Sequence, residues 1–248
     1  MLNGRRLHAL LTINKDKRPL LSLLGISAAI TAAVVLTMTL KTPRIHAGED
    51  DNQDKTKIAI GFSIAPVPLN LKGKDKALVG LGSYIVNASA DCNGCHTMNA
   101  QTEYVPTGDP YLLRPPQGPF TGMRQVNPAT YLGGGSDFGP FPGLVHLYSR
   151  NLTPDKTGRP AGGMTYKQFL TVIRTGKDDD HLHPTCTGAP DGTCIPAPFN
   201  GDLLQVMPWP TFQSLTDHDI QAIYEYLSTI PCIDTVVAGA PILRNSCP

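Results

Sequence analysis

The pentapeptide Cys92-Asn93-Gly94-Cys95-His96 constrains this chain more than any other feature of its sequence. Two cysteines separated by two residues and followed directly by a histidine form the spacing that attaches a haem covalently. One turn of backbone then presents both thiols to the vinyl groups at one porphyrin edge, and it holds His96 at the iron as an axial ligand. The motif occurs once, so it predicts one covalent haem c per chain.

A Cys-x-x-Cys pair can also serve as a redox-active dithiol or as part of a zinc site. A redox-active Cys-x-x-Cys needs a thioredoxin-like βαβ context, and no such pattern is visible around residue 92. A zinc site needs two further ligands. The candidates for that role are Cys186 and Cys194, or His181 and His183. The exported location inferred below favours haem over both alternatives.

The sixth iron ligand is expected to be Met207, because a thioether raises the reduction potential and suits an electron carrier. Pro208 and Pro210 stiffen the backbone around Met207, which lies in a loop between two expected helices. The other methionines considered were Met98, which is too close to His96, Met123 in a proline-rich loop, and Met164 beside a helix start. Bis-histidine ligation would instead use His146, His181 or His183.

The N-terminal part of the chain contains an uncharged stretch, Leu20 to Leu40. At roughly 1.5 Å per residue, this stretch is long enough to cross the apolar core of a bilayer, about 30 Å thick, as a helix. Basic residues precede it and an acidic run follows it, which orients the rest of the chain outside the cytoplasm. We expect a location in the bacterial inner membrane, with the domain facing the periplasm.

These features divide the chain into four expected parts. Residues 1–18 form a cytoplasmic tail, 19–41 a transmembrane anchor or signal sequence, 42–75 a largely polar tether and 76–248 a monohaem cytochrome c domain. Within the tether, Ile58 to Val67 is apolar enough to pack. The net charge of +1 supplies no basic face for a nucleic-acid partner. The expected partners are redox proteins, and the membrane through the N-terminal helix.

Four cysteines lie outside the haem motif, and an oxidising compartment lets disulfides persist. Four cysteines allow three pairings. We expect Cys186–Cys194 and Cys232–Cys247, because each pair closes a short local loop.

Three helices are predicted from apolar spacing and end signals. The first runs from about residue 76 to 90, the second begins at Thr165 with Gln168 completing a capping box, and the third begins at Thr216 and ends before Pro231. No stretch alternates as a strand does. The predicted class is mainly α with long loops.

Together these stretches resemble the class I cytochromes c, and more closely the cytochrome c domains of membrane-bound dehydrogenase cytochrome subunits. The resemblance is carried by Gly82-Ser83-Tyr84 ahead of the haem motif, Tyr131 to Gly143 with Asn151 to Asp155, Phe169 to Gly176, and Met207-Pro208-Trp209 through Leu227. It implies a class I cytochrome c-like helical domain preceded by one transmembrane helix. It also implies that the first and last helices cross, with Gly82 near Tyr224, and that Asn151, Arg174 or Trp209 bind the haem propionates.

This chain departs from the resemblance in carrying a single haem motif, where those subunits usually carry several. Residues 178–204 are also longer than the corresponding loop, and the tail with Cys232 and Cys247 is unusual. The leading interpretation is a non-enzymatic electron carrier between exported redox partners. The alternatives are an electron-accepting subunit of a periplasmic dehydrogenase, or a haem peroxidase or sensor with an open sixth site.

The fate of the apolar stretch can be tested on the mature protein. An uncleaved anchor is expected because the stretch exceeds the 7–15 residues usual for a signal peptide. Sequencing the N-terminus of the protein purified from membranes should therefore find residues that precede Leu40. A mature N-terminus at Gly48, directly after Ile45-His46-Ala47, would identify the stretch as a signal peptide instead.

Overall fold

The computed structural model describes residues 47–112, 124–142, 144–179, 186, 194–235 and 247–248. The chain divides into two compact units, residues 1–47 and 48–248, and the description below concerns the second unit. The expected tail and apolar span lie outside the described residues. Within the described ranges, no helix has both the length and the apolar character that crossing a membrane requires. The four-part division of the chain stays a prediction.

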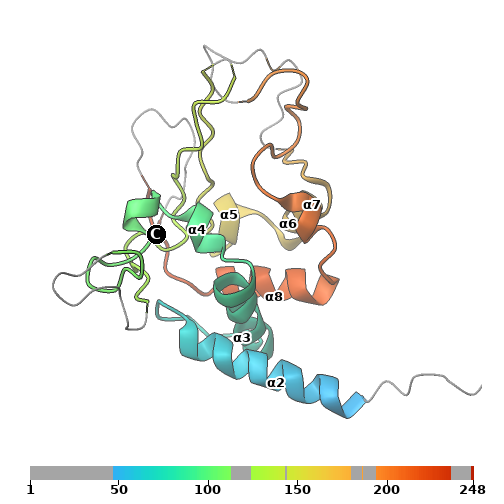
Figure 1. Cartoon of the computed structure of the whole chain (residues 1–248). Helices are drawn as coiled ribbons and strands as arrows, with labels where there is room; N and C mark the ends of the chain where they lie inside the picture. Colours follow the sequence, from blue (N-terminus) through green and yellow to red (C-terminus); the bar gives the residue numbers. More distant parts are fainter. Residues whose placement is uncertain (1–46, 113–123, 143, 180–185, 187–193, 236–246) are drawn as a thin grey trace, which may run out of the picture. The chain divides into compact units, whose positions relative to one another are not determined.

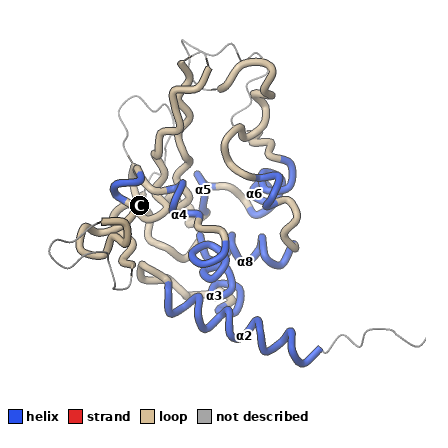
Figure 2. The backbone as a smooth tube through the Cα atoms, in the orientation of Figure 1, coloured by secondary structure: helices blue, strands red, loops and turns tan. Residues whose placement is uncertain are grey.

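Helices supply the regular structure of the described residues (Figures 1 and 2). In chain order they are α2 (Ala47–Ile64), α3 (Lys76–Tyr84), a π-helical turn (Ile85–Ser89), α4 (Cys92–His96), a 3-10 turn (Ala100–Thr102), α5 (Pro160–Gly163), α6 (Tyr166–Thr175), α7 (Trp209–Phe212) and α8 (Asp217–Leu227). The same residues form isolated β-bridges but no strand. The predicted mainly α class is confirmed.

The helix ends follow the local signals in the sequence. Thr165 and Gln168 form the predicted capping box of α6, and Gly176 ends that helix with a φ of +69°, a conformation that favours glycine. Thr216 and Asp219 form a second capping box at the start of α8. The predicted helix over residues 76–90 is α3 continued by the π-helical turn.

The end of α8 differs from the prediction, which placed it at Pro231. The helix ends at Leu227, because the next residues tighten into a turn. The Thr229 N–H donates to Tyr226 O, three residues back, at 2.9 Å, and the Thr229 hydroxyl donates to the same carbonyl. Ile230 is still buried at the end of this turn.

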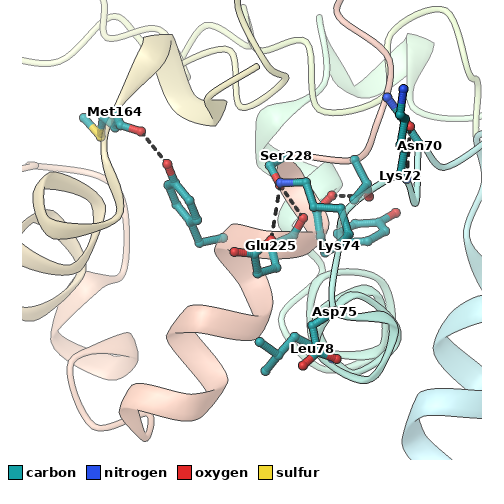
Figure 3. A network of polar contacts seen from close by, with 11 residues as sticks. Asn70, Lys72, Lys74, Asp75, Leu78, Met164, Glu225 and Ser228 are labelled. Atoms are coloured by element: carbon teal, nitrogen blue, oxygen red, sulfur yellow. Dashed lines mark hydrogen bonds and ion pairs between the residues drawn. The ribbon is translucent and has the colours of Figure 1, made fainter. Parts of the chain in front are cut away.

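The crossing of α3 and α8 is closest at Gly82. A Cβ atom built at Gly82 would lie 1.9 Å from the carbonyl oxygen of Ala222 and 2.8 Å from Tyr226 Cβ, so no side chain fits there. The expected crossing is therefore present, and the atoms nearest to Gly82 belong to Ala222 and Tyr226, which flank Tyr224 in α8. The hydroxyl of Tyr224 instead donates to the carbonyl of Met164 at 2.9 Å (Figure 3).

Helix α2 lies in the segment expected as a tether, and the sequence analysis did not predict it. It packs closely against α3, because a Cβ at Gly61 would lie 1.9 Å from the carbonyl oxygen of Gly80. Ile58 and Phe62 pack against the core, and the Ser83 hydroxyl donates to Gly61 O at 2.7 Å. The apolar residues of this segment thus pack on the domain, as their composition suggested.

The chain between α2 and α3 is also held against α8. Lys74 Nζ lies 3.3 Å from a carboxylate oxygen of Glu225 and donates to the Ser228 hydroxyl at 2.6 Å (Figure 3). The Asn70 N–H donates to Thr229 O at 2.8 Å, and Val67 is buried in the core. These contacts hold the linker between the end of α2 and the start of α3 against α8 and the turn that follows it.

A buried polar cluster links the helices to the loop that follows residue 130. The hydroxyls of Tyr131 and Tyr226 lie 2.8 Å apart, and Tyr131 also donates to the Asn87 side-chain oxygen. The Asn87 amide donates to the Ser83 carbonyl at 2.9 Å and to the Tyr226 hydroxyl at 3.1 Å. Because each buried polar group finds a partner, the cluster specifies how these three elements meet.

The cysteines outside the haem motif form the two predicted disulfides. Cys186 pairs with Cys194 and Cys232 pairs with Cys247, which confirms the local pairing. The remaining cysteines, Cys92 and Cys95, are both free thiols. Four cysteines therefore form two disulfides, and the Cys-x-x-Cys pair stays unbonded.

Candidate functional site

A cavity of about 350 Å³ lies beside α4. Apolar side chains supply most of its wall, and these come from α6, from α8 and from the segments around Leu147 and Leu204. The wall also carries the sulfur and nitrogen groups of Cys92, Cys95, His96, Met164, Met207 and His146, and the charged groups of Asp91, Arg150, Asp178 and Asp202. The haem motif and Met207 thus border the same space, although 110 positions separate His96 from Met207 in a sequence of 248 residues.

The two free thiols reach this cavity from α4, a helix of five residues. Asp91 precedes the helix with a φ of +46°, so the chain turns sharply before Cys92. Burial, followed by the nearby Asp91 carboxylate, raises the pKa of the Cys92 thiol to about 12. Burial also raises the pKa of Cys95. Both groups are therefore neutral thiols at neutral pH.

The imidazole of His96 is oriented by the backbone. Its Nδ1 lies 2.7 Å from the carbonyl oxygen of Arg150, and because a carbonyl only accepts, Nδ1 carries the proton. Burial lowers the pKa of His96, which favours the neutral ring. A neutral imidazole with its proton on Nδ1 keeps the Nε2 lone pair available for a metal.

The glycine-rich loop after Tyr131 fixes the motif from its other side. The Asn93 side-chain oxygen accepts from Leu132 N–H at 2.9 Å, and Gly134 N–H donates to His96 O at 2.6 Å. Gly134 has a φ of +69°, and a Cβ there would lie 2.4 Å from the backbone of Arg150. The loop therefore needs glycine at this position to bring the Arg150 carbonyl to His96.

The structure narrows the set of possible second ligands. Met207 and Met164 both line the cavity, and so does His146, whose Nδ1 lies 2.8 Å from Asp137. Met98 does not line it. Met123, His181 and His183 lie outside the described residues. Met164 is almost fully buried in the core. Met207 belongs to residues 201–208, a continuous run of the chain that forms part of the cavity wall.

The three residues expected at the haem propionates have other polar partners and do not line the cavity. The Asn151 amide donates to Ile233 O at 2.7 Å, and Trp209 Nε1 donates to Leu204 O at 3.1 Å. Arg174 binds the carbonyl of Leu215 at 2.6 Å and also the carboxylate of Asp217. Their role at a propionate stays a prediction, and in this structure each one joins two segments of the chain.

An ion pair on the cavity wall was missed by the sequence analysis. Arg150 pairs with Asp178, whose side chain is only 6% exposed, and its guanidinium also donates to Ala161 O at 3.2 Å. Arg150 thus contributes its carbonyl to His96 and its charge to the wall. Nothing in the sequence marks these two residues, because they are far apart in the chain and belong to no repeating pattern.

The residues of this site fit a covalently bound haem. The chain pairs its other four cysteines and leaves the Cys-x-x-Cys thiols free at the cavity. The neighbouring imidazole is held in the metal-binding tautomer, and the surrounding wall is mostly apolar, as a porphyrin requires. Cys186 and Cys194 are bonded to each other and so are not zinc ligands beside Cys92 and Cys95, whereas His181 and His183 lie outside the described residues.

Comparisons with known proteins agree with this description. The chain is 25% identical over 153 residues to the fructose dehydrogenase cytochrome subunit of Gluconobacter japonicus, a match that covers 61% of this chain and 21% of that protein. It is 26% identical over 152 residues to the gluconate 2-dehydrogenase cytochrome c subunit of Pantoea cypripedii, covering 60% and 22%. It is 27% identical over 168 residues to the alcohol dehydrogenase (quinone) cytochrome c subunit of Gluconacetobacter polyoxogenes, covering 67% and 24%.

The matched region spans about a quarter or less of each relative's length. No protein-family model matches the chain, and no solved structure matches it. The resemblance predicted from the motifs is confirmed: the chain is similar to the cytochrome c subunits of dehydrogenases.

The ion pair on the cavity wall generates a testable prediction. Asp178→Asn should lower the free energy of unfolding by about 3 kcal/mol, because it leaves the partly buried Arg150 charge without its carboxylate. Asp179→Asn is the matched control, since that side chain is 73% exposed and only loosely paired with Lys177, and it should change stability by less than about 0.5 kcal/mol. Urea unfolding of both variants at pH 7 measures the difference. Equal effects would mean that the pair does not stabilise the wall.

Proposed function

We propose that this protein is a membrane-tethered monohaem c-type cytochrome that transfers electrons between exported redox partners. One observation carries the proposal: the free thiols of Cys92 and Cys95, the oriented imidazole of His96 and the thioether of Met207 border a single apolar cavity. The similarity to cytochrome subunits of dehydrogenases supports the same role.

Each of these residues has a defined task. The thiols of Cys92 and Cys95 would hold a haem through thioether bonds, formed by addition of each S–H across a vinyl group. His96 would bind the iron through Nε2, while the Arg150 carbonyl holds the ring in place. Met207 would supply a second ligand, and the apolar wall would exclude water. When bound, the haem supplies one-electron exchange at iron.

The arrangement of the elements supports a class I cytochrome c-like domain. The motif follows α3, the methionine segment precedes α8, and these two helices cross at Gly82. The same proposal includes anchoring through residues 19–41 and a periplasmic location in a bacterium. They are supported by the apolar stretch, its flanking charges and the two disulfides, which persist in an exported domain.

A second role, as an electron-accepting subunit of a periplasmic dehydrogenase, is favoured by the names of the relatives. The chain corresponds to only a small part of each relative, so the substrate and the partner subunits do not carry over. A stable complex with a dehydrogenase in gel filtration of detergent-solubilised membranes would favour this role over a free carrier.

Covalent attachment can be tested directly. The protein purified from cells that mature c-type cytochromes should keep one haem per chain after acid and organic-solvent extraction, because the thioethers survive denaturation. The double variant Cys92→Ala/Cys95→Ala should release its haem into the solvent or contain none. Haem staining of denaturing gels and absorbance measure both results. Haem that leaves the unaltered protein would remove the c-type assignment.

The role of Met207 is tested by Met207→Ala. Haem should stay attached, but the reduction potential should fall, because a thioether favours ferrous iron. The far-red sulfur-to-iron absorption band of the ferric protein should vanish, and the ferrous protein should bind carbon monoxide readily. Met98→Ala is the control, since Met98 does not line the cavity, and it should leave the spectrum unchanged.

Two results would contradict this assignment. A far-red band that survives Met207→Ala would transfer the ligand role to Met164 or Met123. An unaltered protein that lacks the band and takes up carbon monoxide at once would favour a peroxidase or sensor with an open sixth site.

A further inference from the structure

The wall segment 201–208, which carries Met207, is held by contacts that lie outside regular secondary structure. Leu204 N–H donates to Gly176 O at 2.8 Å, directly after α6. The indole of Trp209 donates to Leu204 O at 3.1 Å, and its ring lies against Gly176, where a Cβ would be 2.3 Å from the ring. These contacts fix the segment at Leu204 and at Trp209, on either side of Met207.

A third contact joins this segment to Ile195, the residue that follows the disulfide-bonded Cys194. Gln205 makes two hydrogen bonds with the backbone of Ile195: its Oε1 accepts from Ile195 N–H at 2.6 Å, and its Nε2 donates to Ile195 O at 2.8 Å. We call this pair the Gln205 clamp. Ile195 is 3% exposed, and the adjacent Cys194 is 1% exposed and bonded to Cys186.

The clamp satisfies both polar atoms of one amide side chain and both polar atoms of one peptide residue. Such a cyclic pair fixes orientation as well as distance, because neither group can rotate without losing a hydrogen bond. Gln205 itself lines the cavity, as does Met207 two residues later. The Gln205 side chain therefore holds the backbone of Ile195 in place beside the cavity.

We propose that Gln205 is a positioning residue that keeps Met207 at the haem iron by fixing the methionine segment to Ile195, next to the Cys186–Cys194 disulfide. The inference rests on the proposed function, because it takes Met207 as the ligand. An intramolecular ligand competes with external ones through its effective concentration, which falls when the segment that carries it moves more widely. The clamp therefore keeps the iron saturated with the thioether and closed to small ligands.

This assignment also gives the Cys186–Cys194 bridge a task beyond closing its own loop. The bridge restrains Cys194, Ile195 follows it directly, and Ile195 is the residue that Gln205 binds. The disulfide is thereby coupled to Met207 through one side chain.

The test compares Gln205→Leu with Gln213→Leu. The first substitution keeps the bulk of the side chain but removes both hydrogen bonds of the clamp. The second removes the same group from Gln213, an exposed glutamine beyond Met207, whose side-chain amide donates a hydrogen bond to Pro210 O at 3.0 Å. For Gln205→Leu, carbon monoxide should bind the ferrous protein about tenfold faster, since two neutral hydrogen bonds change an opening equilibrium by that order.

The ferric Gln205→Leu protein should also lose part of its far-red band, with the haem content unchanged. Gln213→Leu should match the unaltered protein in both measurements. If Gln205→Leu does not accumulate as holoprotein, the pair Cys186→Ser/Cys194→Ser supplies the second variant, with the same direction of change expected.

The outcomes separate this inference from the proposed function. If the far-red band of the unaltered protein vanishes in Met207→Ala, and Gln205→Leu and the serine pair both behave as Gln213→Leu does, the clamp does not position the ligand and the inference fails alone. If Met207→Ala leaves the band in place, the ligand assignment itself fails, and the inference falls with it.

Discussion

The close contact of α3 and α8 at Gly82 determines how the haem motif and the Met207 segment are placed around the cavity. Helix α3 leads through the π-helical turn into the haem motif, and α8 follows the segment that carries Met207, with the short helix α7 between them. Because no side chain separates the two backbones at Gly82, the ends of the helices are brought together within narrow limits. Beside the crossing, Tyr131 is hydrogen-bonded to Asn87 and Tyr226. These bonds fix the start of the loop after Tyr131, and this loop holds the backbone of His96.

Local chemistry made much of this arrangement predictable. The capping box at Thr165, the helix start at Thr216 and the two short-loop disulfides each depend on residues that are close in sequence, and each forms as expected. Helix α2 was missed because its first half is rich in charge, and only its contact with Gly80 explains why the segment is ordered against the domain.

Contacts between distant residues were harder to predict. Asn151, Arg174 and Trp209 were expected at the propionates from a resemblance alone, and the structure shows each of them joining segments of the chain. Arg150 and Asp178 lie on the cavity wall instead. The sequence did not predict this ion pair, because neither residue belongs to a recognisable motif. The carbonyl that orients His96 is a backbone group, which no side-chain motif can reveal.

Helix α2 extends the folded domain toward the N-terminus beyond α3. Its 18 residues span about 27 Å as a helix, whereas the same residues as a coil would have a broad range of lengths. Docked through Gly61 on α3, the helix keeps one length and one direction relative to the core of the domain. Helix α2 is therefore part of the folded domain, and a shortened chain that began at α3 would expose the face of α3 that Gly61 now covers.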